Sequence, residues 1–520
     1  MGNPYVRFAG NFPAGPRPPE WPVIIQGGMG VAVSNWRLAR AVSLAGHLGV
    51  VSGTAIDTVL VRRLQDGDVG GHVRRALAAC PWPALAAQVL ARYFRPDGRA
   101  PGQPYARLTL WTMESSAFRQ ALAMVGGFVE VWLAKVGHSG RVGINLLTKV
   151  TLPTLPVLYG ALRAGVDVVL MGAGIPRDIP GALDCLAEHQ VAAQHCDVVS
   201  HDAADASPWV RFDPQRYEAV DFPPLVRPAF FPIIAAHSLA TLMARKASGS
   251  VQGFVVEGPT AGGHNAPPRG TKRFDEQGQP VYGDRDVVDL DTVAALGYPY
   301  WLAGGVGSPA GLRSAQALGA VGIQVGTLFA HCEESGLAPS LKHQVRTAAL
   351  AEAGVMRVYT DPLASPTGFP FKVVDVADTL SDQRVYGARE RICELGYLRE
   401  AYRDERGRVR FRCASEPVRD YMAKGGRQED TVDRKCLCSG LLAAAGMPQT
   451  QANGKVEPAI LTSGDDFEGV RALWLARAGP YSARDAIDYL TQALAIPGAE
   501  GVSVRGASHL LATNPVQEQA

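Results

Sequence analysis

The stretch Gly253-Phe-Val-Val-Glu-Gly-Pro-Thr-Ala-Gly-Gly-His264 decides the fold of this chain. Its apolar run, Phe254 to Val256, is typical of a buried strand, and it leads directly into Glu257, a glycine-rich turn and one histidine. Glycines at such a strand end let the backbone turn sharply or lie close to a ligand. The segment therefore predicts a strand that ends at a binding edge, with His264 in place for chemistry.

The same arrangement recurs twice further along the chain. Trp301-Leu-Ala-Gly-Gly-Val-Gly307 and Gly322-Ile-Gln-Val-Gly-Thr327 are again apolar runs that open into glycine-rich corners. A parallel α/β barrel holds phosphorylated ligands in this way, at the C-terminal ends of its strands. Three consecutive units therefore favour a (β/α)₈ TIM barrel.

Eight apolar runs of strand length support this fold class, because eight parallel strands close such a barrel. The runs lack strict alternation, which fits strands covered on both faces. Helices are predicted between them, for example over residues 34–45 with Ser34 as the N-cap, and over residues 309–318. The predicted strands are residues 22–25, 48–52, 142–147, 166–171, 230–235, 253–257, 300–303 and 322–325.

The barrel pattern ends near residue 375. Prolines and a glycine between residues 362 and 370 interrupt the chain, and the part that follows is charged and has the pattern of helices. We therefore predict a barrel over residues 1–375, with an insertion near residues 191–228. A mainly helical C-terminal domain over residues 376–520 is expected to act as a lid or as the contact of a homo-oligomer.

The composition is that of an ordinary globular protein. The 520 residues are 47% hydrophobic and 19% charged, and 51 basic against 49 acidic residues leave a net charge of +2. With no like-charge run and no apolar stretch of about eighteen residues, we expect neither a nucleic acid nor a membrane as a partner. Eight cysteines in 520 residues and no apolar leader predict a cytoplasmic, reduced protein.

The glycine corners predict a phosphate site. A phosphate needs backbone N–H donors that it can approach closely, and glycines before a helix supply them. Gly304-Gly305 and Gly326-Thr327 fit this need, and Gly262-Gly263 forms a third corner. One corner alone could be no more than a tight turn, but three in register favour a cofactor. No GxxxxGK[ST] loop and no GxGxxG βαβ unit occurs, which disfavours a nucleoside triphosphate or a Rossmann-bound dinucleotide.

Two other strand ends suit a flat heterocycle. The first predicted strand runs into Gly27, Gly28 and Met29, and these glycines permit a planar ring to lie against the backbone. The third predicted strand contains Asn145, whose amide both donates and accepts hydrogen bonds. Together with the phosphate corners, these groups predict a planar, phosphorylated cofactor across the mouth of the barrel.

The ordered motifs resemble those of the nitronate monooxygenases, once called 2-nitropropane dioxygenases, and of the related flavin-dependent enoyl reductases. The resemblance covers roughly residues 20–375 and implies a barrel that binds FMN. The motifs that carry it are Ile25-Gln-Gly-Gly-Met29, Gly143-Ile-Asn145, Glu257-Gly-Pro-Thr-Ala-Gly-Gly-His264, Ala303-Gly-Gly-Val306 and Gln324-Val-Gly-Thr327.

The resemblance also implies roles for single residues. The flavin contacts of the family fall on Asn145, Gln324 and Glu257, where relatives often carry Gln. The catalytic histidine of the family maps onto His264. The residues implied to lie near the FMN phosphate are Gly304, Gly305, Gly326 and Thr327.

His264 suits either of two reactions, because an imidazole titrates near neutral pH. In the leading prediction, an FMN-dependent monooxygenase oxidises a nitronate or nitroalkane with O₂, and His264 takes the α-proton or anchors the small-molecule substrate. In the alternative, an NAD(P)H-dependent enoyl reductase acts on thioesters, in trans for a polyketide or fatty-acid synthase, with a carrier protein as partner. A second alternative is a non-catalytic flavin-binding subunit of a biosynthetic complex.

Two departures from the family pattern leave the substrate open. Thr260 stands where relatives commonly carry an acidic residue or serine, and Asn265-Ala-Pro-Pro-Arg-Gly270 follows the histidine in place of Arg-Gly or Ile-Gly. In relatives this lip of the pocket touches the substrate.

Half of the cysteines lie in the predicted C-terminal domain. Four thiolates could hold zinc or an iron–sulfur cluster, but the spacing of 19, 22 and 1 residues matches no standard ligand pattern. Buried cysteines also pack as small apolar side chains. We therefore predict no metal at these residues, which are Cys393, Cys413, Cys436 and Cys438.

Overall fold

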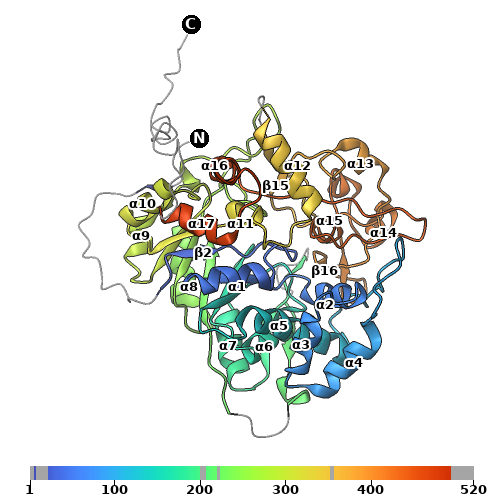
Figure 1. The fold of residues 1–520 in the computed structure, drawn as a ribbon. Helices are drawn as coiled ribbons and strands as arrows, with labels where there is room; N and C mark the ends of the chain where they lie inside the picture. The colour runs from blue at the N-terminus through green and yellow to red at the C-terminus, as the bar shows by residue number, and fades with distance from the viewer. Residues whose placement is uncertain (1–4, 7–20, 200–206, 219–222, 352–355, 493–520) are drawn as a thin grey trace.

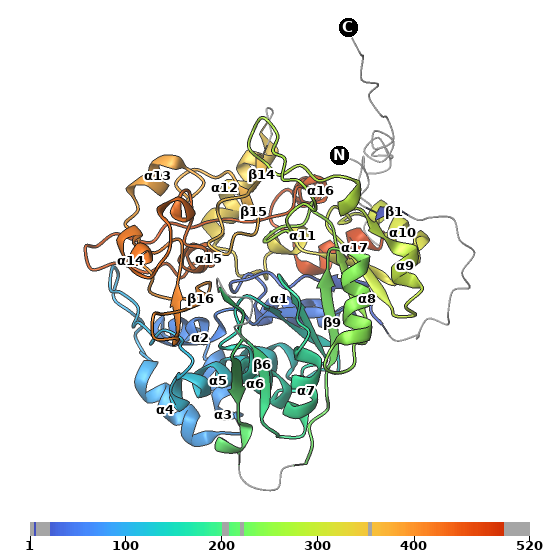
Figure 2. The same cartoon turned by 180° about the vertical axis from the view of Figure 1, so that it is seen from behind.

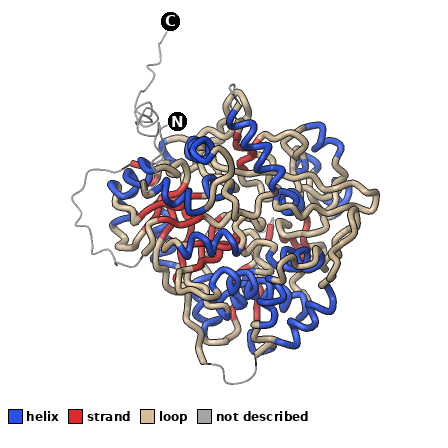
Figure 3. Tube along the Cα trace, in the orientation of Figure 1, coloured by secondary structure: helices blue, strands red, loops and turns tan. Residues whose placement is uncertain are grey.

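Eight parallel strands form the centre of the protein, seen in a computed structural model (Figures 1 and 3). Their order is β2-β13-β12-β10-β9-β5-β4-β3, and a parallel bridge between Ile25 and Leu48 brings the two end strands together. Gln26 N donates to Leu48 O at 2.9 Å across this seam. The predicted α/β barrel is confirmed. The structure describes residues 5–6, 21–199, 207–218, 223–351 and 356–492.

All eight predicted strands are confirmed, with ends within two residues of those expected. Their inner side chains pack into a cluster that includes Ile25, Phe231 and Trp301, while the outer side chains pack under helices. Burial on both faces explains the lack of alternation in the sequence. The strands are β2 Ile24–Gln26, β3 Gly49–Ser52, β4 Val142–Leu147, β5 Val168–Gly172, β9 Ala229–Ile234, β10 Phe254–Glu257, β12 Tyr300–Ala303 and β13 Gly322–Val325.

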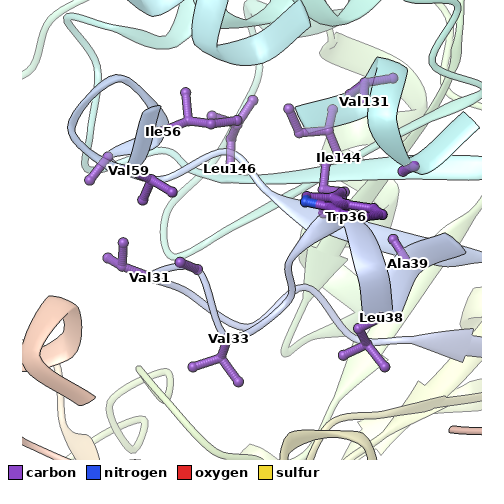
Figure 4. Close-up of a cluster of buried hydrophobic side chains, with 14 of the residues drawn as sticks. Val31, Val33, Trp36, Leu38, Ala39, Ile56, Val59, Val131, Ile144 and Leu146 are labelled. Carbon is purple, nitrogen blue, oxygen red and sulfur yellow. The ribbon is translucent and has the colours of Figure 1, made fainter. Parts of the chain in front are cut away.

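Helices surround the strands, as Figure 3 shows. Trp36 of α1 packs among apolar side chains of α2, α5 and β4, including Ile144 (Figure 4). The helices of this part are α1 Trp36–Leu44, α2 Ile56–Gln65, α3 His72–Ala78, α4 Pro83–Tyr93, α5 Ala117–Lys135, α6 Thr154–Arg163, α7 Ile179–Ala187, α8 His237–Lys246, α9 Leu290–Ala294, α10 Pro309–Ala317, α11 Thr327–Ala330 and α12 Pro339–Leu350, with short 3₁₀ turns η1 Pro214–Arg216 and η2 Asp284–Asp286.

Helix α10 begins at Pro309 as predicted, with Ser308 as its N-cap, but the N-cap predicted for α1 is wrong by one residue. Asn35 caps α1, because its side chain accepts from the N–H groups of Arg37 and Leu38. Ser34 is used elsewhere: its Oγ accepts from Met29 N at 2.8 Å and donates to a carbonyl of the loop after β2. Both residue types make good caps, so tertiary contacts decide between them.

Helix α5 packs unusually close to α6. A Cβ atom at Gly160 would lie 1.8 Å from Met124 O, and one at Gly127 would lie 2.3 Å from Val157 O. Glycines therefore let the two backbones touch. Among the described helices, α5 alone has the length and hydropathy of a membrane span, and most of it is buried inside the protein.

Residues after the barrel form helices and one hairpin. Helices α13 to α15 gather beside β16 on one side, whereas α16 and α17 lie against α11 of the barrel (Figures 1 and 2). The hairpin of β16 and β17 lies within the part predicted to be mainly helical. The elements are α13 Gln383–Ala388, β16 Glu400–Arg403, β17 Val409–Arg412, α14 Val418–Ala423, η3 Gln428–Thr431, α15 Leu437–Ala444, α16 Glu468–Arg477 and α17 Ala483–Leu490.

Smaller strands connect the barrel to its additions. Within the predicted insertion, β6 Ala192–His195 pairs with β8 Trp209–Phe212, and β7 Val198–Val199 joins the hairpin through β16. Strand β14 Val358–Asp361 pairs with β15 Phe371–Val374. Strand β1 Tyr5–Val6 pairs with β11 Val288–Asp289. The insertion thus contacts the C-terminal part, while the domain boundary near residue 375 stays a prediction.

Candidate functional site

A cavity lies at the carboxyl ends of the barrel strands. It encloses roughly 1870 Å³ of empty space with its open mouth included. The lining contains every residue predicted for the site, namely His264, Gly27, Gly28, Met29, Asn145, Glu257, Gly262, Gly263, Gly304, Gly305, Gln324, Gly326 and Thr327.

The loop after β2 is held by a buried glutamine and by Ser34. Gln26 is fully buried; its Oε1 accepts from Val50 N at 3.0 Å, and its Nε2 donates to Ser34 Oγ at 2.7 Å. These bonds tie the loop to the next strand of the barrel. They fix the backbone of Gly27 and Gly28 at the cavity wall.

The corner after β12 requires glycine. Gly304 and Gly305 have φ values of 90° and 68°, in the left-handed region that other residues rarely adopt. A Cβ atom at Gly304 would also lie 3.0 Å from both Gly258 O and Thr260 Oγ1. The corner is therefore a bare backbone cradle of the kind that an anion can approach.

Thr327 stands beside this cradle, at the start of α11. Its Oγ1 accepts a hydrogen bond from Gly464 N at 2.9 Å, so the hydroxyl hydrogen remains available to donate. Thr327 therefore has a hydrogen-bond donor to offer a ligand in the cavity.

Three buried polar atoms in the lining have no partner among the described residues. They are Gln324 Oε1, Thr260 Oγ1 and Ser463 Oγ. Buried polar groups in native proteins are nearly always hydrogen-bonded, because a buried polar group without a partner lowers the stability of the folded state. Their arrangement therefore fits a ligand with its own hydrogen-bonding groups.

Glu257 ends β10 at the cavity wall. Burial raises the pKa of this carboxyl to about 8, so it is mainly protonated at neutral pH. A protonated carboxyl both donates and accepts, as the side-chain amide of glutamine does. Glu257 therefore offers a ligand the same pair of hydrogen bonds as Gln.

His264 is held by the hairpin of β14 and β15. Its backbone forms an antiparallel bridge with Phe371, and the two rings lie edge to face with centroids 4.9 Å apart. Its Nε2 lies 2.7 Å from Ser365 Oγ. Burial, together with the nearby charge of Lys149, lowers the pKa of His264 to about 4. The imidazole is therefore neutral at pH 7.

The C-terminal part supplies lining that sequence reasoning missed. Thr462 Oγ1 accepts from Gly263 N at 2.8 Å, and Lys372 Nζ lies 2.7 Å from Asp465 Oδ2. A Cβ atom at Gly262 would fall 2.7 Å from Ser463 C. The run Thr462-Ser-Gly464 consists of small and polar residues, but no strand precedes it. Its sequence therefore lacks the strand-end pattern that marks the other corners.

The cysteines of the C-terminal part are free thiols. Cys393 and Cys413 are hydrogen-bonded to each other, and Cys438 reaches the cavity lining. Within the described ranges, no group of three or more His, Cys, Asp or Glu side chains is arranged to hold a metal ion. That these cysteines bind no metal stays a prediction.

The sequence model of the family described as nitronate monooxygenase matches residues 194–361, which include the loop from Glu257 to His264 and the glycine corners at Gly304 and Gly326. The predicted resemblance to this family is confirmed. With it, the predictions that the chain is an enzyme and an oxidoreductase are confirmed. Comparison with curated protein sequences gives no match.

Similar solved structures share low identity with the chain. FabK from Thermotoga maritima is 15% identical, with 91% of this chain and 92% of that chain covered and a TM-score of 0.43. A nitroalkane oxidase from Streptomyces ansochromogenes is 16% identical, with 90% and 94% covered and a TM-score of 0.41. The enoyl reductase domain of MlnA from Bacillus amyloliquefaciens is 12% identical, with 70% and 66% covered and a TM-score of 0.35.

Proposed function

We propose that this protein is an FMN-dependent enzyme that oxidises a nitronate or nitroalkane with dioxygen. The observation that carries the proposal is a neutral His264 on the wall of a cavity that also contains a bare glycine cradle. The sequence match to the nitronate monooxygenase family spans both features. A histidine and a cradle suited to a phosphate thus line one cavity.

The residues present fit FMN. Gly304, Gly305 and Thr327 would hold its phosphate, since the cradle is open and the hydroxyl has a hydrogen to donate. Gln324 and Asn145 would meet the ring, and the unpartnered Gln324 Oε1 would be able to accept from its N–H group. When bound, FMN supplies electron transfer between substrate and dioxygen.

The side chains of this chain then have separate tasks. His264 takes the α-proton of a nitroalkane, because its free imidazole is unprotonated at working pH and Ser365 fixes the ring. A nitronate, which has already lost that proton, needs His264 only as an anchor. Glu257, protonated at neutral pH, donates to the ring without placing a negative charge there.

The C-terminal part is proposed to act as a lid. Leu398, Cys438 and Ser463 all line the cavity, so residues after 375 form part of its wall. A lid excludes water from a reactive site and commits the substrate. Contact between copies of the chain remains part of the proposal for this region.

The test is an anaerobic absorbance titration of the FMN-loaded protein. We expect propyl-2-nitronate and 2-nitropropane to bleach the oxidised flavin, and NADH and NADPH to leave it unchanged. His264→Gln should slow reduction by 2-nitropropane by about 10²-fold or more, as loss of a general base does, and should affect the nitronate far less. Bleaching by NAD(P)H followed by reoxidation with an enoyl thioester would replace the proposal with the reductase. A protein that takes up no FMN would overturn both.

A further inference from the structure

A chain of three side chains leads away from His264. His264 Nε2 lies 2.7 Å from Ser365 Oγ, and Ser365 Oγ lies 2.8 Å from Thr367 Oγ1. Ser365 is fully buried, whereas Thr367 is partly exposed. The two hydroxyls therefore connect the imidazole to a less buried place without a break.

That place is a second cavity beside the first. Thr367 lines it together with Lys149, Asp197 and Glu400. Tyr397 and Leu398 line both cavities and so stand between them. The second cavity is lined by groups that exchange protons with water, and Thr367 is the end of the hydroxyl chain that reaches it.

The loop that carries the hydroxyls is fixed from the C-terminal part. Lys435 Nζ lies 2.8 Å from Asp361 Oδ2, and Asp361 Oδ1 accepts from Ala364 N at 3.0 Å. Arg434 donates to Ser365 O at 2.6 Å. These bonds hold Ser365 in place against His264, so the hydrogen-bonded chain is built into the fold.

We propose that Ser365 and Thr367 are positioning residues that carry a proton between His264 and the second cavity. When the imidazole gains the α-proton on Nδ1, the proton on Nε2 passes to Ser365 Oγ. The hydroxyl proton of Ser365 passes to Thr367 Oγ1, and that of Thr367 passes to water. One proton leaves the site, and all three side chains end as neutral as they began.

This relay rests on the proposed function in one respect, namely that His264 removes a proton during turnover. A nitroalkane delivers that proton and a nitronate does not. The relay therefore predicts different effects on two substrates of the same enzyme. A merely structural role of Thr367 would slow both substrates alike.

The experiment uses the FMN-loaded Thr367→Val variant, which keeps the shape of the side chain and removes the hydroxyl. We expect kcat for 2-nitropropane to fall roughly tenfold, less than on loss of the base itself, with kcat for propyl-2-nitronate unchanged. Thr367→Ser should restore nitroalkane turnover. Thr148→Val is the matched control, because Thr148 lines the same cavity but its hydroxyl bonds Gly172 O instead of the chain.

A substrate-free measurement separates the relay from the reaction. In protein labelled with ¹⁵N-histidine, exchange of the proton shared by His264 Nε2 and Ser365 Oγ with water should be several-fold slower in Thr367→Val than in wild type. If the wild type oxidises neither substrate, the proposed function fails and this exchange rate decides the relay. The relay would be overturned if the proton exchanged in Thr367→Val at the wild-type rate. It would also be overturned if Thr148→Val and Thr367→Val lowered kcat for 2-nitropropane equally.

Discussion

Asn145 lies so close to Gly28 that a Cβ atom at Gly28 would fall 2.1 Å from Asn145 Cβ. Asn145 Nδ2 also donates to Gly28 O at 3.2 Å, so the loop after β2 and the end of β4 hold each other. We expect Gly28→Ala to push the amide out of place and to weaken FMN binding at least tenfold, which is about 1.4 kcal/mol. Fluorescence quenching of FMN by the apoprotein measures this affinity.

The matched control is Gly387→Ala in helix α13. A Cβ atom there meets nothing within 4 Å, and alanine favours a helix over glycine. This variant should bind FMN as the wild type does and melt at the same or a slightly higher temperature. Equal FMN affinity of Gly28→Ala and Gly387→Ala would show that the contact with Asn145 does not matter for the cofactor.

The barrel and its rim were predictable because the strands themselves carry the signal. Each strand is an apolar run, and a parallel barrel brings all its strand carboxyl ends to one rim. Corners as far apart as Gly28 and Gly326 therefore had to line one cavity, as they do.

The lining from the C-terminal part was not predictable in this way. Ser463 and Tyr397 reach the cavity only through tertiary contacts, such as the pairing of Lys372 with Asp465. These contacts join residues far apart in the chain, and no local pattern marks them. The partner of His264, Ser365, comes likewise from a loop whose position depends on Lys435.

The ion pair of Lys372 and Asp465 should anchor the segment that carries Ser463. Lys372 is 4% exposed, and its Nζ lies 2.7 Å from Asp465 Oδ2. Asp465→Ala would leave a buried ammonium without its partner. Because the Asp465 side chain is 31% exposed, we expect a loss of about 1–2 kcal/mol in the free energy of unfolding, less than for a fully buried pair. FMN binding should weaken as well. Denaturant unfolding and the quenching titration measure the two effects.

The paired substitution Lys372→Met with Asp465→Leu should recover most of this stability, because no charge is then left buried. Asp488→Ala serves as the control, since Asp488 pairs with the exposed Arg484 on helix α17 and should cost no more than about 0.5 kcal/mol. If Asp465→Ala and Asp488→Ala were equally mild, the pair would not hold the segment.

Tyr397 should tie the C-terminal part to the barrel. Its hydroxyl donates to Asp57 Oδ1 at 2.5 Å and lies 2.6 Å from Thr58 Oγ1, and Arg119 pairs with the other oxygen of Asp57. Tyr397→Phe removes one partner of a buried carboxylate, so we expect a loss of about 1–2 kcal/mol in unfolding free energy. Tyr489→Phe, at a buried tyrosine of α17, should change stability by a smaller amount.

Glu257 should give the protein a pH dependence that Glu257→Gln lacks. Burial raises the pKa of Glu257 to about 8 from the ordinary value near 4.5, so between these values the folded protein holds a proton that the unfolded chain has lost. Stability therefore falls as pH rises through this window and levels off above about 8. The difference in unfolding free energy between wild type and Glu257→Gln should change by on the order of 3–4 kcal/mol between pH 5 and pH 8.

The same ionisation should govern FMN binding. Above about pH 8 the wild-type carboxylate can no longer donate to the ring, so FMN affinity should fall, while Glu257→Gln keeps its donor and its affinity. Titrations of both proteins with FMN at pH 6.5, 7.5 and 8.5 measure this directly. If the FMN affinities of the wild type and of Glu257→Gln kept the same ratio at all three pH values, Glu257 would be already ionised in the folded protein, or its proton would not face the cofactor.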